Sequence, residues 1–187
     1  TLLSETLRRR TGDEHALDVA CGTGHASPAV APMLSGGRVT GVNFSAGMLD
    51  QARRKPVAQN IGNVEFLERD MTALGFPADS FDVAVCAFGI FFVDDMDTQL
   101  AHVASVVKPG GKVVISSFEA EHYFHPLREM MLARLRSYAV AIPPPSWRRV
   151  GDEGACAALF DRAGLTNTRV ESRNSGYYLD DAERWWD

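Results

Sequence analysis

The sequence predicts an α/β fold with a doubly wound, mostly parallel sheet. Three observations support this prediction. Short apolar runs typical of buried strands recur five times, and segments with helical spacing lie between several of them. Strands that alternate with helices form right-handed crossovers, which makes the sheet parallel. A small-residue loop, Cys21-Gly22-Thr23-Gly24, follows the first strand, where such folds bind ligands. The expected architecture is therefore Rossmann-like.

The elements of the first two thirds of the chain follow from local patterns. Ser45 is placed to cap a helix that ends before Pro56, and the basic residues of its last turn suit the helix dipole. Lys108-Pro109-Gly110-Gly111 is expected to end a helix and turn the chain. The expected strands are 16–20, 38–42, 64–68, 81–88 and 112–118, and the expected helices are 25–34, 45–55 and 96–107.

The last third departs from simple alternation. Residues 119–150 read as a helical insertion, which forms either a wall over the binding crevice or a helix packed on the sheet. Its apolar stripe comprises Leu127, Met131, Leu135 and Tyr138. Residues 152–165 predict a last helix closed by Gly164, and residues 168–179 a sixth strand bulged at Gly176. We expect one domain spanning 1–187, truncated at both ends because the chain opens and closes within a pattern.

Composition restricts the classes of partner. The 187 residues carry a net charge of −5, which argues against a nucleic-acid partner. The three cysteines are widely spaced and lie in no metal-binding cluster, so we expect no metal site and a reducing, cytoplasmic compartment. No apolar run is long enough for a membrane span. A small-molecule substrate fits best, with the protein a monomer or homodimer.

The glycine loop admits two interpretations. A dinucleotide site needs G-x-G-x-x-G/A and an acidic residue after the second strand, but this chain has Ser27 at the third position and Asn43 after that strand. Asp18, inside the first strand, is costly to bury unless it meets a cation. The loop also contains no Lys or Arg for phosphates. A ligand with an amino-acid end, a ribose and an adenine fits better.

These residues resemble a known family. "LDVACGTG" looks like motif I of the class I S-adenosylmethionine (SAM) dependent methyltransferases, and "GVNFSAGMLDQARRK" and "VASVVKPGGKVVISSF" continue the match in order. The resemblance covers about residues 16–118. Within that class the chain is most similar to the ubiquinone/menaquinone biosynthesis C-methyltransferases. It implies the class I methyltransferase fold, SAM as cofactor and S-adenosylhomocysteine (SAH) as product.

The resemblance also implies roles for individual residues. Asp18 would take the methionine ammonium, and the loop Ala20, Cys21, Gly22 and Gly24 would lie against the methionine part. Asn43 would hold the ribose. Phe44 and Met48 would enclose the adenine, Asp70 would accept its amino group beside the Met71 backbone, and Ala87 and Phe88 would line the sulfonium end.

Two positions depart from the family pattern. Ala20 stands where the family usually has Gly. Asn43 stands where it has Asp or Glu, and an amide offers one acceptor oxygen to the ribose hydroxyls where a carboxylate offers two. We expect Asn43 to weaken SAM binding about tenfold without abolishing it.

The expected reaction is methyl transfer to an O, N or C atom of a small, aromatic or partly apolar acceptor. Phe88, Phe91, Phe92 and Phe124 motivate the aromatic acceptor. An acceptor that must lose a proton needs a general base, for which the candidates are His122, Tyr123 and His125. Two alternatives stay open: a catalytically weak, methyltransferase-like binding or scaffold protein, and a nucleotide-dependent oxidoreductase.

Overall fold

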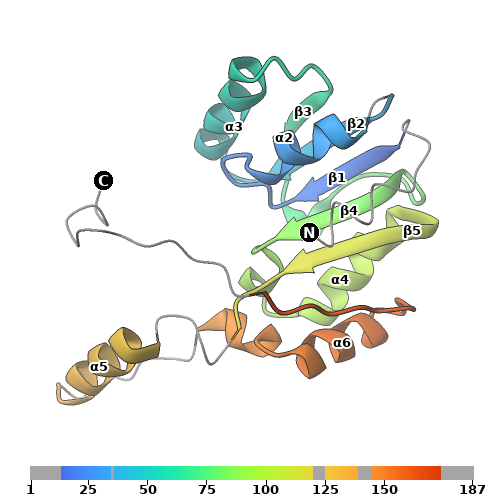
Figure 1. Ribbon diagram of the computed structural model, residues 1–187. Helices are drawn as coiled ribbons and strands as arrows, with labels where there is room; N and C mark the ends of the chain where they lie inside the picture. Colours follow the sequence, from blue (N-terminus) through green and yellow to red (C-terminus); the bar gives the residue numbers. More distant parts are fainter. Residues whose placement is uncertain (1–13, 35, 120–124, 139–144, 174–187) are drawn as a thin grey trace.

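A five-stranded sheet forms the centre of the molecule. The computed structural model describes residues 14–34, 36–119, 125–138 and 145–173. The strands are β1 (His15–Val19), β2 (Arg38–Asn43), β3 (Val64–Glu68), β4 (Phe81–Ala87) and β5 (Val107–Ser116). They pair in the order β3-β2-β1-β4-β5, and every pair is parallel (Figure 1). The predicted doubly wound α/β fold is confirmed. Successive strands are added on one side of β1 up to β3 and on its other side from β4 onward, so the switch point of the sheet lies between β1 and β4.

Helices cover both faces of the sheet. The α-helices are α2 (Ala26–Val30), α3 (Ala46–Ala58), α4 (Met96–Ser105), α5 (His125–Arg136) and α6 (Glu153–Arg162). Single 3-10 turns are η1 (Ala31–Met33), η2 (Met71–Ala73), η3 (Ile90–Phe92) and η4 (Ser146–Val150). Alternate strand residues enter different cores: Ala16 packs with α2 and η1, whereas Leu17 packs with α4 and α6.

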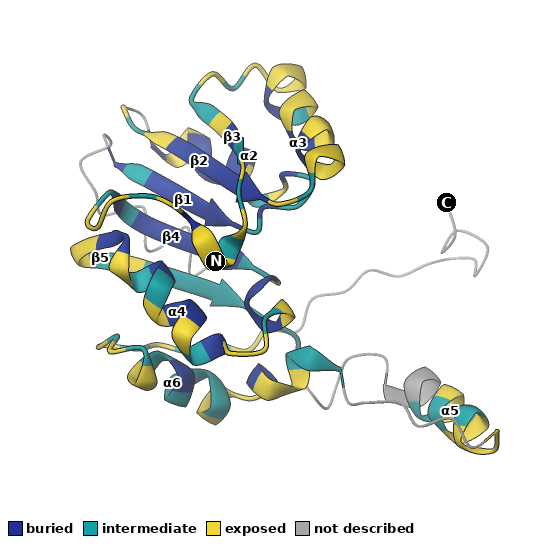
Figure 2. Cartoon of the chain, turned by 180° about the vertical axis from the view of Figure 1, so that it is seen from behind, coloured by how far each residue is buried: buried dark blue, intermediate teal, exposed yellow. Residues whose placement is uncertain are grey.

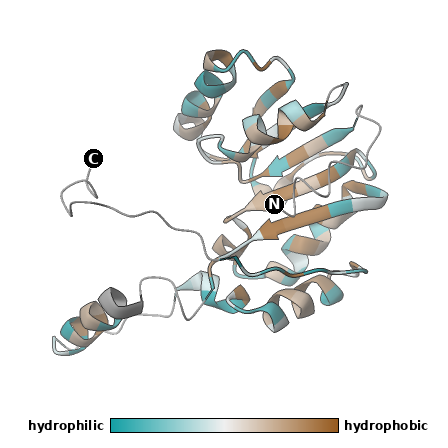
Figure 3. Cartoon of the chain, viewed as in Figure 1, coloured by the Kyte–Doolittle hydropathy of each residue, from teal (hydrophilic) through white to brown (hydrophobic). Residues whose placement is uncertain are grey.

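The two cores account for the composition of the strands. β1 and β4 lie inside the sheet and are buried on both faces, so nearly all their buried residues are apolar (Figures 2 and 3). Asp18 is the exception within β1, with only 2% of its surface exposed. A buried carboxyl in such a strand requires a separate explanation, because burying a charge costs free energy.

Capping residues set most helix boundaries as expected. The Ser45 hydroxyl accepts the Met48 N–H at the start of α3, and Asp152 caps α6 through the Ala155 N–H. Gly164 ends the last helix with φ +75°. The expectation that Pro56 follows the helix is wrong, because α3 continues through it to Ala58. Pro56 lies in the last turn and is buried there, so its apolar ring gains contacts that offset the lost backbone bond.

The expected start of the fifth strand is also wrong. β5 begins at Val107 and not at 112, because Val107 still pairs with Phe81 across an irregular register that resumes at Val83 and Lys112. Residues 108–111 therefore lie inside a bulged strand. The described part of the expected sixth strand, 168–173, carries no strand pairing, although it runs alongside the body (Figure 1).

α5 stands apart from the sheet, on the side toward which the strands point (Figures 1 and 2). Met130 and Met131 are exposed on it, and Tyr138 is exposed in the turn that follows it. Residues 120–124 and 139–144, on either side of α5, lie outside the described residues, so the role of the insertion as a wall over the crevice or a helix packed on the sheet stays a prediction. Within the described segments, no helix combines the length and apolar character needed to cross a membrane.

Candidate functional site

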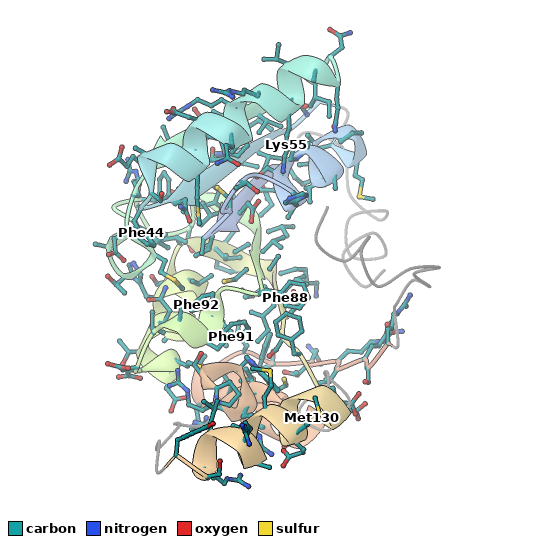
Figure 4. The ribbon with its side chains drawn as sticks, turned by 90° about the vertical axis from the view of Figure 1, so that its left-hand side faces the viewer. Phe44, Lys55, Phe88, Phe91, Phe92 and Met130 are labelled. Carbon is teal, nitrogen blue, oxygen red and sulfur yellow. The ribbon has the colours of Figure 1, made fainter. Side chains whose placement is uncertain are left out.

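The predicted cofactor residues gather at one edge of the sheet. They follow β1, β2, β3 and β4, which are neighbours in space and parallel, so their carboxyl ends meet. Figure 4 looks onto this edge and shows Phe44 on the α3 side, and Phe88, Phe91 and Phe92 on the other. The switch point between β1 and β4 lies between the two groups.

The loop after β1 has the backbone of a ligand cradle. Gly22 has φ +55°, and a Cβ added there would meet no atom within 4 Å. Gly24 differs, since an added Cβ would lie 2.7 Å from the Ala52 Cβ and 3.1 Å from the Phe66 ring. Gly22 therefore leaves open space against the backbone, whereas Gly24 lets α3 pack closely on the loop.

Asp18 is the buried acid beneath this loop. Its Oδ2 accepts the Ser27 hydroxyl at 2.5 Å, and its Oδ1 has no hydrogen-bond partner among the described residues. Burial raises the pKa of Asp18 to about 6, against the opposing effect of the Ser27 bond. An unpartnered buried carboxylate oxygen suits a cationic ligand group. The residues present therefore fit the ammonium end of SAM.

Strain concentrates at the switch point. Ala20 and Phe88, which follow β1 and β4, both have φ +55°. The other non-glycine residues with positive φ are Asn60, Asp79 and Asn167, types that tolerate this conformation. Ala and Phe do not, and each costs about 1–2 kcal/mol there. Such strain clusters at functional sites, because the surrounding structure must enforce it.

Asn43 ends β2 as a buried residue beside the exposed Phe44. Its Nδ2 donates to the Met48 Sδ at 3.7 Å, a weak contact. The Phe44 ring is 73% exposed and Met48 is 44% exposed. These two apolar side chains present surface at the edge without packing into the core. They have the exposure that a planar ligand would cover.

Asp70 caps the turn after β3. Its Oδ1 accepts the Thr72 N–H at 2.8 Å and the Thr72 hydroxyl at 2.7 Å, bonds that lower the pKa of this carboxyl. α4 fixes the same turn, since the buried Gln99 donates to the Met71 carbonyl at 2.7 Å. Gln99 was not among the predicted site residues, because nothing local in sequence links it to Met71.

An aromatic cluster lines the β4–β5 side of the edge. The ring centroids of Phe88 and Phe118 are 4.6 Å apart, those of Phe118 and Trp147 are 6.0 Å apart, and those of Phe91 and Phe92 are 4.9 Å apart. Phe91 is buried, whereas Phe92 is 76% exposed. Phe118 and Trp147 were not predicted. Phe118 directly precedes the insertion and Trp147 lies near its end, so the two rings meet only through the fold.

The expected general bases are not placed. His122, Tyr123 and also Phe124 lie outside the described residues, and His125 begins α5 with a side chain that is not described. Cys21 and Cys86 are buried beside this edge, and burial raises the pKa of each thiol to about 12, so neither suits nucleophilic chemistry.

One cation does contact the glycine loop, contrary to the expectation from the loop sequence. Lys55 of α3 donates to the Thr23 hydroxyl at 3.4 Å, and its Nζ lies 2.9 Å from the His25 Nε2 (Figure 4). The absence of Lys and Arg from the loop itself is therefore no argument against a dinucleotide. The orphaned Asp18 oxygen remains the argument for a cationic ligand group.

Comparisons with known proteins agree with this geometry. A family model described as a methyltransferase domain matches residues 16–111. The chain is 33% identical over 174 residues to a demethylmenaquinone methyltransferase of Bacillus licheniformis, covering 86% of this chain and 74% of that protein. It is 30% identical over 186 residues to the ubiquinone/menaquinone biosynthesis C-methyltransferase UbiE of Cellvibrio japonicus, covering 89% and 72%. The crystal structure of a SAM-dependent methyltransferase from Aquifex aeolicus shares the fold, with TM-score 0.66, 22% identity, and coverage of 87% and 77%.

The sheet order, the cradle after β1 and these matches define a class I SAM-dependent methyltransferase. The cofactor is SAM, which becomes SAH. Within that class, the chain belongs to the methyltransferase family that includes the demethylmenaquinone and UbiE-type enzymes.

Proposed function

We propose that this methyltransferase acts on a flat, aromatic or partly apolar small molecule, and that the acceptor lies against the aromatic cluster after β4 and β5. The exposed ring of Phe92, next to the buried ring of Phe91, is the observation that carries the proposal. A ring of 76% exposure at a functional edge offers a stacking surface, and aromatic pairs contribute about 0.5–1.5 kcal/mol beyond their buried area.

SAM supplies an electrophilic methyl group on its sulfonium. The protein's task is to orient two reactants and exclude water. Asp18 would bind the ammonium, Asn43 the ribose, and Asp70 with the Met71 backbone the adenine. Because Gly22 has no side chain, the space against the loop backbone stays open. Ala87 and Phe88, at the strained end of β4, would line the reacting end.

A base is needed only for an acceptor that must lose a proton, such as a phenol or an enolisable carbon. We propose that it comes from His122, Tyr123 or His125, which follow β5 in the sequence. Single replacement of each by Phe would separate them. Replacement of the residue that acts as the base should lower kcat and shift the pH profile of the reaction. Replacement of either of the other two should leave both unchanged.

The test of acceptor class is direct. The protein is incubated with SAM and either planar phenols, such as 2-naphthol and 1,4-dihydroxynaphthalene, or the matched aliphatic alcohol cyclohexanol. Mass spectrometry then detects SAH and methylated product. We expect product from the planar compounds, and at least a tenfold loss of kcat/KM in Phe92→Ala. Val57→Ala, on the exposed outer side of α3, is the matched control. Product from cyclohexanol alone would contradict the proposal.

A second candidate is a binding protein with little catalysis, and Asn43 is the observation that favours it. The amide lacks the carboxylate typical of the family and already donates to Met48. Calorimetric titration with SAH decides between the two. Micromolar binding supports the enzyme, and no binding by folded protein supports the second candidate.

A further inference from the structure

A single guanidinium holds the loop that carries the exposed aromatic ring. The segment after β4 contains η3, a one-turn helix of only three residues. A turn this short leaves its last carbonyls without partners inside the helix. The ring of Phe92 projects from this turn, so its position depends on whatever fixes the carbonyls of residues 91–94.

Arg149 supplies those missing bonds. Its Nη2 donates to the Phe91 carbonyl at 2.9 Å and to the Val93 carbonyl at 2.6 Å, and its Nη1 donates to the Asp94 carbonyl at 2.7 Å. The Nε donates to the Ser146 carbonyl at 3.2 Å within η4 itself. The planar, five-donor fork of arginine makes this set possible, and a lysine ammonium could not span it equally well.

The position of Arg149 in the chain adds to this geometry. It lies more than fifty residues after η3, in η4, the last turn of the segment 119–150. Trp147, two residues earlier, meets Phe118 at the other end of the insertion. The base of the insertion, the aromatic cluster and the η3 loop are thus tied together by residues of η4.

We propose that Arg149 is a positioning residue for methyl transfer: it fixes the backbone of residues 91–94 and thereby the Phe92 ring against the acceptor. This inference rests on the proposed acceptor site. Within the described part of the chain, the Arg149 side chain bonds to backbone carbonyls of η4 and of the loop after β4, and to no residue of the loops that carry Asp18 and Asp70. Its loss therefore acts on the acceptor and leaves the cofactor in place.

The chain offers a matched control. The neighbouring Arg148 is exposed, and within the described residues its side chain makes no hydrogen bond or ion pair. Arg149→Met, Arg149→Lys and Arg148→Met are compared with the parent protein. Hydrogen exchange of residues 89–95 and the Kd of SAH are measured alongside steady-state methylation of 2-naphthol and 1,4-dihydroxynaphthalene.

We expect exchange in residues 89–95 to rise at least tenfold in Arg149→Met, and the KM of the acceptor to rise at least tenfold. The Kd of SAH should stay within twofold. Arg149→Lys should give intermediate values, and Arg148→Met should match the parent. The lysine variant retains a folded protein for the comparison should the methionine variant lose stability.

Two results in Arg149→Met would overturn the role of Arg149. One is unchanged hydrogen exchange in residues 89–95, and the other is a rise in the Kd of SAH as large as the rise in the KM of the acceptor. Failure of the parent protein to methylate any planar acceptor would instead overturn the proposed function. The exchange comparison needs no turnover, so the two failures are distinguishable.

Discussion

At the scale of single residues, the site is built from groups that are costly in the free protein. Asp18 is a buried carboxyl with one unpartnered oxygen, and Ala20 and Phe88 have strained backbone conformations. Each cost is of the order of 1–3 kcal/mol, a large share of an ordinary folding free energy. We propose that bound SAM offsets part of this cost, because its ammonium would supply the missing partner of Asp18 Oδ1.

The cost of Asp18 predicts a dependence of stability on pH. The pKa of Asp18 in the folded state is raised from 3.8 to about 6. Its contribution to the free energy of unfolding is therefore fully present below pH 3.8 and is lost as the pH rises to about 6. The total is roughly 3 kcal/mol, of which about 1 kcal/mol falls between pH 5 and pH 7.5. In Asp18→Asn this part of the pH dependence should vanish. Urea unfolding of the parent protein and of Asp18→Asn, both without ligand, measures the free energy of unfolding across that pH range. The same change with pH in both proteins would contradict the prediction.

The amide of Asn43 predicts a gain of affinity. Asn43→Asp restores a second acceptor oxygen and a charge for the ribose hydroxyls, so SAH should bind about tenfold more tightly. Calorimetric titration at pH 7.5 measures the change, and Asn43→Leu, which removes both polar groups, is the reference for complete loss. A weaker complex with Asn43→Asp would mean that the amide serves another contact.

At the scale of elements, the two glycines after β1 have separate tasks. Gly24 is required for the contact between the loop and α3, whereas Gly22 borders open space. Both have positive φ, so backbone strain on substitution is similar and only the surroundings differ. The pair therefore separates packing from ligand binding within one loop.

Replacing each glycine by alanine tests this division. Gly24→Ala should lower the free energy of unfolding by about 2–4 kcal/mol, since overpacking against Ala52 adds to strain. Gly22→Ala should cost about 1–2 kcal/mol in stability from strain alone, yet weaken SAH binding at least tenfold. Thermal unfolding and titration are measured on both. Equal stability losses would refute separate tasks.

Elements with local signals were predicted well, and those decided by distant contacts were not. β3 was predicted at its observed bounds, because a short apolar run with turn residues on both sides is sufficient. The start of β5 was missed, because only pairing with Phe81 keeps residues 107–111 in the strand. The cradle after β1 was found from its glycines, whereas Gln99, Phe118 and Arg149 act through residues 28 or more positions away.

At the scale of the whole molecule, the switch point divides the site into two halves. The β1, β2 and β3 side carries Asp18, Asn43 and the turn at Asp70. The β4–β5 side carries the aromatic cluster. The two halves share a continuous sheet, but among the described residues no side-chain hydrogen bond or ring contact links Asp70 to Phe92. Substitutions on different halves should therefore act on different reactants.

This division predicts independent effects in a double-mutant cycle. Asp70→Ala removes the acceptor for the adenine amino group, so it should raise the Kd of SAH at least tenfold with little change in the KM of a planar phenol. Phe92→Ala should raise the KM of the planar phenol with little change in the Kd of SAH, because its exposed ring lies in the turn after β4, beside Phe91. Since the residues share no partner, the two losses in free energy should add to within about 0.5 kcal/mol. Titration and steady-state rates of both single variants and of the double variant measure this. A coupling well above 0.5 kcal/mol would show that cofactor and acceptor are held by one shared set of contacts, and that the two halves move together when either ligand binds.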